Sequence, residues 1–239
     1  MPQAMIEGGW VILDELNLAE PQILERLNSV LEDHPYLLRT EHDNSAIGRG
    51  GAPVHPDFRI FATMNPAEYA GRSVLSPAYR DRWRGYRFVP SPGEAEYRAL
   101  LRRLVFGVDP EVSVRGRAYR GGVGVPVCGS LAALPGIDRF LGALARFHCS
   151  LEEAARSGVG LGDHRRREKQ VFSRRVLLSV LRYMGAVCAN LPGLPWETGA
   201  RRALNRYYLG RATCGDEREV VARLLDAAGI GPGVWELSQ

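Results

Sequence analysis

The N-terminal third of the chain alternates short apolar runs with apolar residues at helical spacing. Trp10 to Leu13 is a continuous apolar run that ends in two carboxylates, Asp14 and Glu15. This pattern predicts a strand buried on both faces of a parallel sheet. Pro21 then stands at a first helical position, and the apolar stripe from Ile23 to Leu31 predicts an amphipathic helix of about three turns.

Three further segments complete this third of the chain. The polar, Gly-rich stretch from Tyr36 to Asp57 predicts an exposed hairpin or loop insertion. Phe58 to Thr63 is predicted as a second buried strand, and Tyr86 to Val89 as a third. Strands that alternate with helices in this way are typical of an α/β domain with a parallel sheet.

The pattern becomes helical after residue 90. A capping-box spacing from Ser91 to Glu94 opens the first helix, and residues 107–136 read as a loop-rich insertion without periodicity. Four more helices are predicted, over Ile137 to Ala155, Arg174 to Leu191, Thr198 to Leu209 and Glu217 to Ala228. We therefore expect an α/β domain over residues 1–90 and a small all-helical domain over residues 91–239.

Composition limits the class of protein. The chain has 239 residues, of which 45% are apolar and 24% charged, enough for one ordinary domain or two small ones. No run of about eighteen apolar residues and no basic, then apolar, N-terminus is present, so we expect no membrane contact and a cytoplasmic location. The four cysteines are far apart and form no C-x-x-C pair, which favours reduced core thiols.

Two other kinds of site, for nucleic acid and for a metal ion, are weaker possibilities. The net charge of +4 is carried almost wholly by arginine, and the basic run from Arg165 to Lys169 could contact nucleic-acid phosphates. That run is short, contains Glu168 and has no aromatic residues between its charges, so a nucleic-acid partner is not expected. A metal site built from histidines and glutamate matches no known ligand spacing; its residues would be His34, Glu41, His42 and His55.

Four features follow one another in an order that suits nucleoside triphosphate hydrolysis. Asp14 at a strand tip can hold Mg²⁺ through water, and the adjacent Glu15 can orient or deprotonate an attacking water. Asn65 follows the neighbouring strand and can align the same water. Arg82 can neutralise the charge that develops during phosphoryl transfer. The fourth feature is a Ser-Arg-Arg run that opens a helix at Ser173.

Three segments carry a family resemblance. They read GWVILDELNLAEP over residues 9–21, FATMNP over 61–66 and LSPAYRDRW over 75–83. They resemble the AAA+ ATPases of the dynein-related, MoxR-like branch, closely over residues 6–106 and loosely beyond. The resemblance implies a partial P-loop NTPase core followed by a helical lid, with ATP and Mg²⁺ as cofactors. It also implies a homo- or hetero-oligomeric ring, typically a hexamer, that remodels a partner, often one with a von Willebrand type A domain.

The resemblance also assigns roles to single residues. Asp14 and Glu15 occupy the Walker B positions and Asn65 that of the sensor 1 asparagine. Arg82 occupies the place of the arginine finger, since Trp83 stands where phenylalanine is usual.

Two of the assignments have a competitor close by in the sequence. Arg80 is the alternative for the arginine finger. The sensor 2 arginine, which contacts nucleotide from the lid, falls on Arg175, with Arg174 as its alternative.

The phosphate-binding loop of this family, G-x-x-x-x-G-K-[ST], is missing from the sequence. Only thirteen residues precede Asp14, and the single lysine, Lys169, has no glycine before it. We therefore expect the chain alone to be inactive and its sheet to expose an edge. It is either a fragment of a longer ATPase, the favoured interpretation, or a non-catalytic ring subunit that lends Arg82 to a neighbour.

Overall fold

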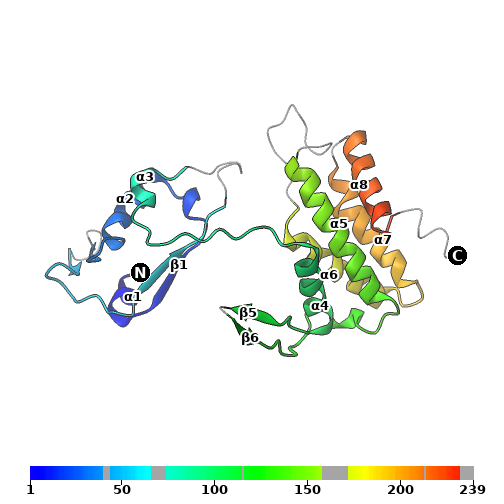
Figure 1. Cartoon of the computed structure of the whole chain (residues 1–239), viewed down its shortest axis with the longest axis horizontal. Coiled ribbons are helices and arrows are strands. Elements are labelled where there is room, and N and C mark those ends of the chain that lie inside the picture. The colour runs from blue at the N-terminus through cyan, green and yellow to red at the C-terminus, as the bar shows by residue number, and fades with distance from the viewer. Residues whose placement is uncertain (40–43, 66–73, 115, 158–171, 213, 232–239) are drawn as a thin grey trace. The chain divides into compact units, whose positions relative to one another are not determined.

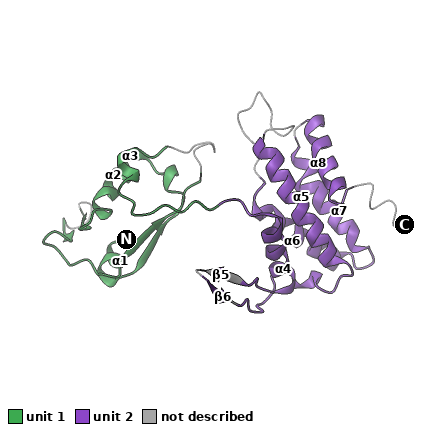
Figure 2. Cartoon of the chain, in the orientation of Figure 1, with its two compact units in different colours: residues 1–89 green, residues 90–239 purple. Residues whose placement is uncertain are grey.

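A computed structural model describes most of the chain (Figure 1), namely residues 1–39, 44–65, 74–114, 116–157, 172–212 and 214–231. The chain forms two compact units, Met1–Val89 and Pro90–Gln239 (Figure 2). Within the described ranges, none of the helices combines the length and the apolar character that crossing a membrane requires.

The first unit is built on a two-stranded parallel sheet. Strand β1 (Trp10–Leu13) pairs with β4 (Arg59–Ala62), with Trp10 opposite Arg59. Both of these predicted strands are therefore confirmed. The prediction that these strands are buried is wrong for both, because Trp10 and Ile12 of β1 remain 72% and 69% exposed and Phe61 of β4 is 45% exposed. Successive side chains of a strand point to opposite faces, and the described residues cover only one face of this sheet.

Short helices and a hairpin accompany the sheet. The predicted helix after Pro21 is confirmed as α2 (Pro21–Leu27), which continues into a 3₁₀ turn, η2 (Asn28–Val30). The predicted hairpin is confirmed by the antiparallel pairing of β2 (Leu37–Leu38) with β3 (Ala46–Ile47). The remaining elements of this unit are α1 (Pro2–Glu7), η1 (Leu16–Leu18) and α3 (Pro77–Arg80).

The predicted third strand is not formed. Residues 86–89 are extended without a paired neighbour, and Tyr86, Phe88 and Val89 are 57%, 80% and 71% exposed. A strand requires hydrogen-bonding partners at its side, and among the described residues the sheet contains only β1 and β4. Residues 86–89 therefore have the apolar pattern of a strand, but no described strand pairs with them.

The second unit is a helical bundle with one small hairpin. All five predicted helices are confirmed, as α4 (Glu94–Phe106), α5 (Ile137–Ser157), α6 (Arg174–Asn190), α7 (Trp196–Tyr207) and α8 (Gly215–Ala227). The expectation of an all-helical domain is wrong, because β5 (Val112–Val114) pairs with β6 (Arg117–Tyr119) in the loop-rich segment, which also holds η3 (Gly129–Leu131). The capping residue also differs: α4 begins at Glu94, so the carboxylate that accepts the N–H of Gly93, at 2.8 Å, belongs to Glu96.

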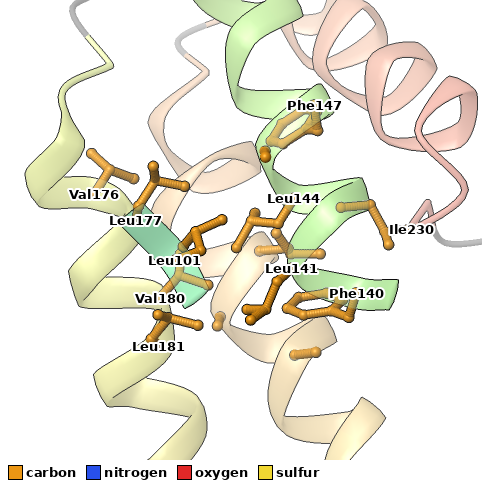
Figure 3. Close-up of a cluster of buried hydrophobic side chains, with 14 of the residues drawn as sticks. Leu101, Phe140, Leu141, Leu144, Phe147, Val176, Leu177, Val180, Leu181 and Ile230 are labelled. Atoms are coloured by element: carbon orange, nitrogen blue, oxygen red, sulfur yellow. The ribbon is translucent and has the colours of Figure 1, made fainter. Parts of the chain in front are cut away.

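One apolar core holds the bundle together. Figure 3 shows side chains from α4, α5 and α6 that meet in its centre, where Leu101, Leu141, Leu144, Leu177 and Leu181 are fully buried. On α5 and α6 they recur at helical spacing, so each helix places one stripe in the core. Burial of a side chain of this size contributes about 2 kcal/mol.

A buried polar cluster interrupts this core. His148 is fully buried, its Nδ1 lies 2.8 Å from the hydroxyl of Tyr208, and its ring packs edge-on against Tyr97. The Tyr97 hydroxyl donates a 2.7 Å hydrogen bond to Glu152. Burial lowers the pKa of His148 to about 4, because a charged imidazole loses its hydration there.

Because His148 is buried in this cluster, we expect the protein to lose stability in acid. Between pH 6.5 and about 4 the unfolded imidazole of His148 binds a proton that the folded one does not. Lowering the pH across that range should therefore reduce the free energy of unfolding, by up to about 3 kcal/mol from this residue. Urea denaturation at pH 7, 5.5 and 4.5 measures the loss, and His148→Gln should lack it.

The neighbouring carboxyl group of Glu152 has the opposite effect on stability as the pH falls. Burial raises the pKa of Glu152, so its protonation in the folded state adds stability as the pH falls. Nε2 of His148 lies 3.8 Å from Oε1 of Glu152, so the difference between wild type and His148→Gln reports the imidazole together with its pairing to this carboxyl. The same pH slope in both proteins would contradict the assignment.

Candidate functional site

The carboxyl ends of β1 and β4 are joined by the side chain of Thr63. Its hydroxyl donates a short hydrogen bond to Oδ1 of Asp14 and accepts the backbone N–H of Glu15 at 3.1 Å. The backbone of Thr63 also donates to the carbonyl of Leu13 at 2.9 Å and accepts from Leu16 at 2.8 Å. These four bonds hold one carboxylate oxygen of Asp14 and the backbone of Glu15 at one exposed edge of the sheet.

Glu15 has an unusual backbone conformation. Its φ of 52° and ψ of 47° lie in the left-handed region, which residues other than glycine adopt uncommonly. The turn carries the chain directly from β1 into η1. Backbone strain of this kind is found preferentially at functional sites, and here it stands directly after the end of β1.

Asn17 attaches the third predicted residue to the same edge. The side chain of Asn17 is 2% exposed, and its Nδ2 donates a 2.8 Å hydrogen bond to the backbone carbonyl of Asn65. The Asn65 side chain itself is exposed. Asp14, Glu15 and Asn65 are therefore brought together by hydrogen bonds between the segments that follow β1 and β4.

The sequence reasoning missed both residues that make these connections. In the sequence, Thr63 is the last residue of a predicted strand, and Asn17 lies in the apolar stretch LNLA. The only signal available was a polar residue at a position where the surrounding pattern is apolar. A buried polar side chain normally has a hydrogen-bonding partner, so this signal does indicate a structural contact.

The predicted arginine finger is held elsewhere in the first unit. Nε of Arg82 donates to Oδ1 of Asn28 at 3.1 Å, and its Nη2 lies 3.5 Å from the carboxylate of Glu32. Arg80, the alternative, is exposed and has no carboxylate partner within the part of the chain that the structure describes. Of these two arginines, Arg82 is thus the one whose guanidinium contacts neighbouring side chains within the described residues.

The predicted sensor 2 residue belongs to the second unit. Arg175 lies in the first turn of α6, is exposed, and lines a pocket of that unit together with Arg206 and Arg211. Its backbone carbonyl accepts the hydroxyl of Ser179 at 2.9 Å. Arg174, the alternative, is exposed as well but does not line this pocket.

The residues at the sheet edge suit a hydrated Mg²⁺. This ion keeps several water ligands and requires few direct carboxylates, which fits a single Asp14 carboxylate beside a threonine hydroxyl. Within the described ranges, this edge included, no three side chains of His, Cys, Asp or Glu gather into a metal-binding cluster. Two residues of the alternative histidine site, Glu41 and His42, and the basic run 165–169 lie outside the described residues.

Comparison with known proteins confirms the family resemblance. Residues 1–83 match the AAA domain of the dynein-related subfamily. Midasin from Dictyostelium discoideum is 43% identical over 86 residues, which are 34% of this chain and 1% of that protein. Midasin from Giardia intestinalis is 42% identical over 100 residues, which are 41% of this chain and 2% of that protein. The chain thus spans only a small part of the length of these relatives.

The role of Thr63 can be tested without nucleotide. Thr63→Val keeps the shape of the side chain but removes the hydroxyl, so the N–H of Glu15 loses its acceptor and Asp14 its donor. We expect faster amide hydrogen exchange at Glu15 and a loss of about 1 kcal/mol in the free energy of unfolding of this unit. Thr63→Ser is the matched control and should retain slow exchange. Equal exchange rates in both variants would contradict the proposed connection.

Proposed function

Because residues 1–83 are part of a dynein-related AAA domain, we propose that this protein supplies the metal-binding and water-activating side of an ATP-hydrolysing site. The observation that carries the proposal is the edge at which Thr63 ties Asp14 and Glu15 to the end of β4, beside Asn65. Two carboxylates and an amide at the carboxyl ends of neighbouring parallel strands are suited to hydrolysis of a phosphoanhydride.

Each residue at the edge has a separate task in this proposal. Asp14 is the residue that would hold a hydrated Mg²⁺, and the ion would supply neutralisation of the phosphate charge. Glu15 accepts a proton from the attacking water, and its backbone stands in the left-handed turn that follows β1. Asn65 aligns that water, with its backbone fixed by Asn17.

We assign the arginine finger to Arg82, acting on nucleotide of an adjacent subunit in an oligomeric ring. Its bonds to Asn28 and Glu32 support this assignment, because they hold the guanidinium in one orientation at the surface of the unit. A group that is already oriented loses little entropy when it engages the transition state. The ring is a homo- or hetero-hexamer in this proposal, and hydrolysis remodels a partner protein, such as one with a von Willebrand type A domain.

The second unit is assigned as the lid, with Arg175 contacting nucleotide. The sequence shown contains no G-x-x-x-x-G-K-[ST] loop, whose amides and lysine would hold the β- and γ-phosphates. The 239-residue chain alone should therefore bind ATP only weakly and hydrolyse none. Turnover would require a phosphate-binding loop from the rest of the assembly.

Glu15→Gln tests the central assignment. In an assembled ATPase that includes a phosphate-binding loop, this change removes the proton acceptor but preserves size and hydrogen bonding. We expect nucleotide binding to change little while hydrolysis falls by at least about 10²-fold. Steady-state ATPase assays with a parallel binding titration measure the two effects. Unchanged turnover would remove Glu15 from the mechanism.

Arg82→Ala tests the finger. Because the charge that it neutralises exists mainly in the transition state, we expect hydrolysis to fall by on the order of 10³-fold with binding largely preserved. Mixing Arg82→Ala subunits with Glu15→Gln subunits should restore part of the activity, since some interfaces then contain both intact residues.

Two controls separate catalysis from structure in this experiment. Glu32→Gln breaks the ion pair of Arg82 but keeps the guanidinium, so hydrolysis should be retained. Arg84→Ala removes another arginine, which pairs with exposed Asp33 at 2.8 Å, and should have little effect. If rings form and the mixture remains inactive at every ratio, the finger is not Arg82, and Arg80→Ala becomes the variant to measure.

A further inference from the structure

The hairpin of the helical unit is longer than its two strands. The register in which β5 pairs with β6 continues to an antiparallel bridge between Val108 and Val123. Residues 108–114 and 117–123 therefore form one antiparallel ribbon, which extends away from the helices of its own unit (Figure 1). A ribbon of two strands has two outer edges, and an edge that no other strand covers can pair with a further strand.

The base of the ribbon is held to α4. The guanidinium of Arg103 donates to the carbonyl of Gly107 at 3.1 Å and forms an ion pair with Asp109. On the other side of the base, Cys128 is buried in the bundle core and donates its N–H to the carbonyl of Leu104 at 2.8 Å. This attachment at both ends reduces the conformational entropy that binding to the ribbon would cost.

The segment that returns to the bundle has an unpaired outer edge. The carbonyl of Gly122 accepts a hydrogen bond of 3.0 Å from the opposite segment, and the N–H of Gly124 donates one of 2.9 Å to it. Successive residues of a strand direct their backbone groups to opposite sides, so those of Val123 and Val125 point away from the opposite segment. Within the described parts of the chain, no hydrogen bond engages these outward groups.

A row of exposed valines lies along this edge. Val123, Val125 and Val127 occupy alternate positions, separated only by glycine and proline, and Val108 lies opposite Val123. Val123 and Val125 are 84% and 89% exposed, and the other two valines are exposed as well. Alternate side chains of an extended segment point to the same face. A single exposed valine is ordinary, whereas a row of them beside unpaired backbone groups indicates a binding surface.

The charge beside this edge is positive. Between Glu111 and Asp138 the sequence contains three arginines and no acidic residue. Arg120 is exposed and forms no ion pair within the described residues. It stands three positions before Val123 and therefore on the opposite face of the ribbon. Glu111 lies across from Arg120 on the other segment, about 4.8 Å farther from the free edge, so a ligand at this edge meets the arginine first.

We propose that this free edge binds an extended segment of a partner protein in which apolar and acidic residues alternate. The incoming segment adds a strand to the ribbon by pairing with the outward N–H and carbonyl groups of Val123 and Val125. Its apolar side chains cover the valines, and its carboxylates on the other face meet Arg120. Backbone bonds supply affinity in such an addition, and the alternating side chains supply specificity. This binding has no part in the proposed hydrolysis of ATP and goes beyond that function.

Titration of the full 239-residue chain with a synthetic peptide tests the proposal. The peptide is acetylated and amidated, has the sequence TEVEVEVT, and is added without nucleotide or Mg²⁺, so the result does not depend on the hydrolysis site. We expect a Kd on the order of 10⁻⁴ M in NMR spectra. Absence of any chemical-shift change up to about 10 mM peptide, roughly a hundred times that Kd, would overturn the proposal.

Amide hydrogen exchange locates the bound peptide. Exchange at Val123 and Val125 should slow at least about fivefold at saturation, because their N–H groups gain acceptors. The amide of Gly124 is an internal control, since it is already bonded to the carbonyl of Gly107 and should change little. Unchanged exchange at both valines in the presence of bound peptide would exclude strand addition.

Two further peptides separate the backbone contribution from the charge. A fully N-methylated TEVEVEVT cannot donate backbone hydrogen bonds and should bind at least about tenfold more weakly. The peptide TKVKVKVT keeps the apolar alternation but reverses the charge, and it should bind at least about fivefold more weakly. Equal binding of either peptide would overturn the proposal.

Charge reversal at Arg120 provides the matched variant. Arg120→Glu should weaken TEVEVEVT about tenfold and should bind TKVKVKVT more tightly than the wild type does. Arg201→Glu is the control, because Arg201 is exposed on α7, and it should change the Kd less than about twofold. Circular dichroism verifies that both variants keep their helices. Equal weakening by the two variants would show non-specific attraction and overturn the proposal.

A second copy of the chain or a nucleic acid could also occupy a basic ribbon. Sedimentation of the chain without peptide tests the first: a dimer that Arg120→Glu dissociates would assign the edge to self-association. A short DNA duplex tests the second, and binding that is tighter than that of TEVEVEVT and is lost in Arg120→Glu would assign the edge to nucleic acid. Either result would overturn the proposal.

Discussion

The candidate site depends on a single hydroxyl group at the junction of two strands. Thr63 donates to the carboxylate of Asp14 and accepts the N–H of Glu15, while its own backbone continues the pairing of β4 with β1. A two-stranded sheet has few ladder hydrogen bonds to align its ends. The side-chain bridge therefore holds the Asp14 carboxylate and the backbone of Glu15 beside the segment that carries Asn65, and the strained turn at Glu15 is held by the same contact.

The sequence predicts well those helices and strands whose buried side chains follow a regular spacing within the element itself. The stripes of α5 and α6 lie at helical spacing, and each helix buries that stripe in the bundle core. The runs of β1 and β4 were also recognised, because Asp14 and Asn65 mark the points where apolar residues stop. The segment 86–89 has the same local pattern and forms no strand, since a strand also needs a neighbour with free hydrogen-bonding groups.

The sequence predicts which residues form the candidate site, but not the hydrogen bonds that join them. The order of Asp14, Glu15 and Asn65 along the sequence indicated a shared edge, because parallel strands bring their carboxyl ends together. The bridges made by Thr63 and Asn17 join segments 48 residues apart, and no local spacing encodes such pairing. The convergence of Arg206 with Arg175 has the same origin: it depends on how α7 packs against α6.

The two units differ in how much apolar burial stabilises them. This difference affects what holds the candidate site at the sheet edge of the first unit. Among the residues that the structure describes, the bundle has one continuous core, whereas the first unit has two clusters of four buried apolar residues each, with Trp10 and Ile12 exposed beside them. A small core contributes little stability to offset the conformational entropy of the chain. The geometry of the sheet edge must therefore rest on hydrogen bonds such as those of Thr63 and Asn17 more than on packing. A ligand or subunit that binds the ordered edge stabilises it by mass action, so occupancy of the site and order of the first unit are thermodynamically linked.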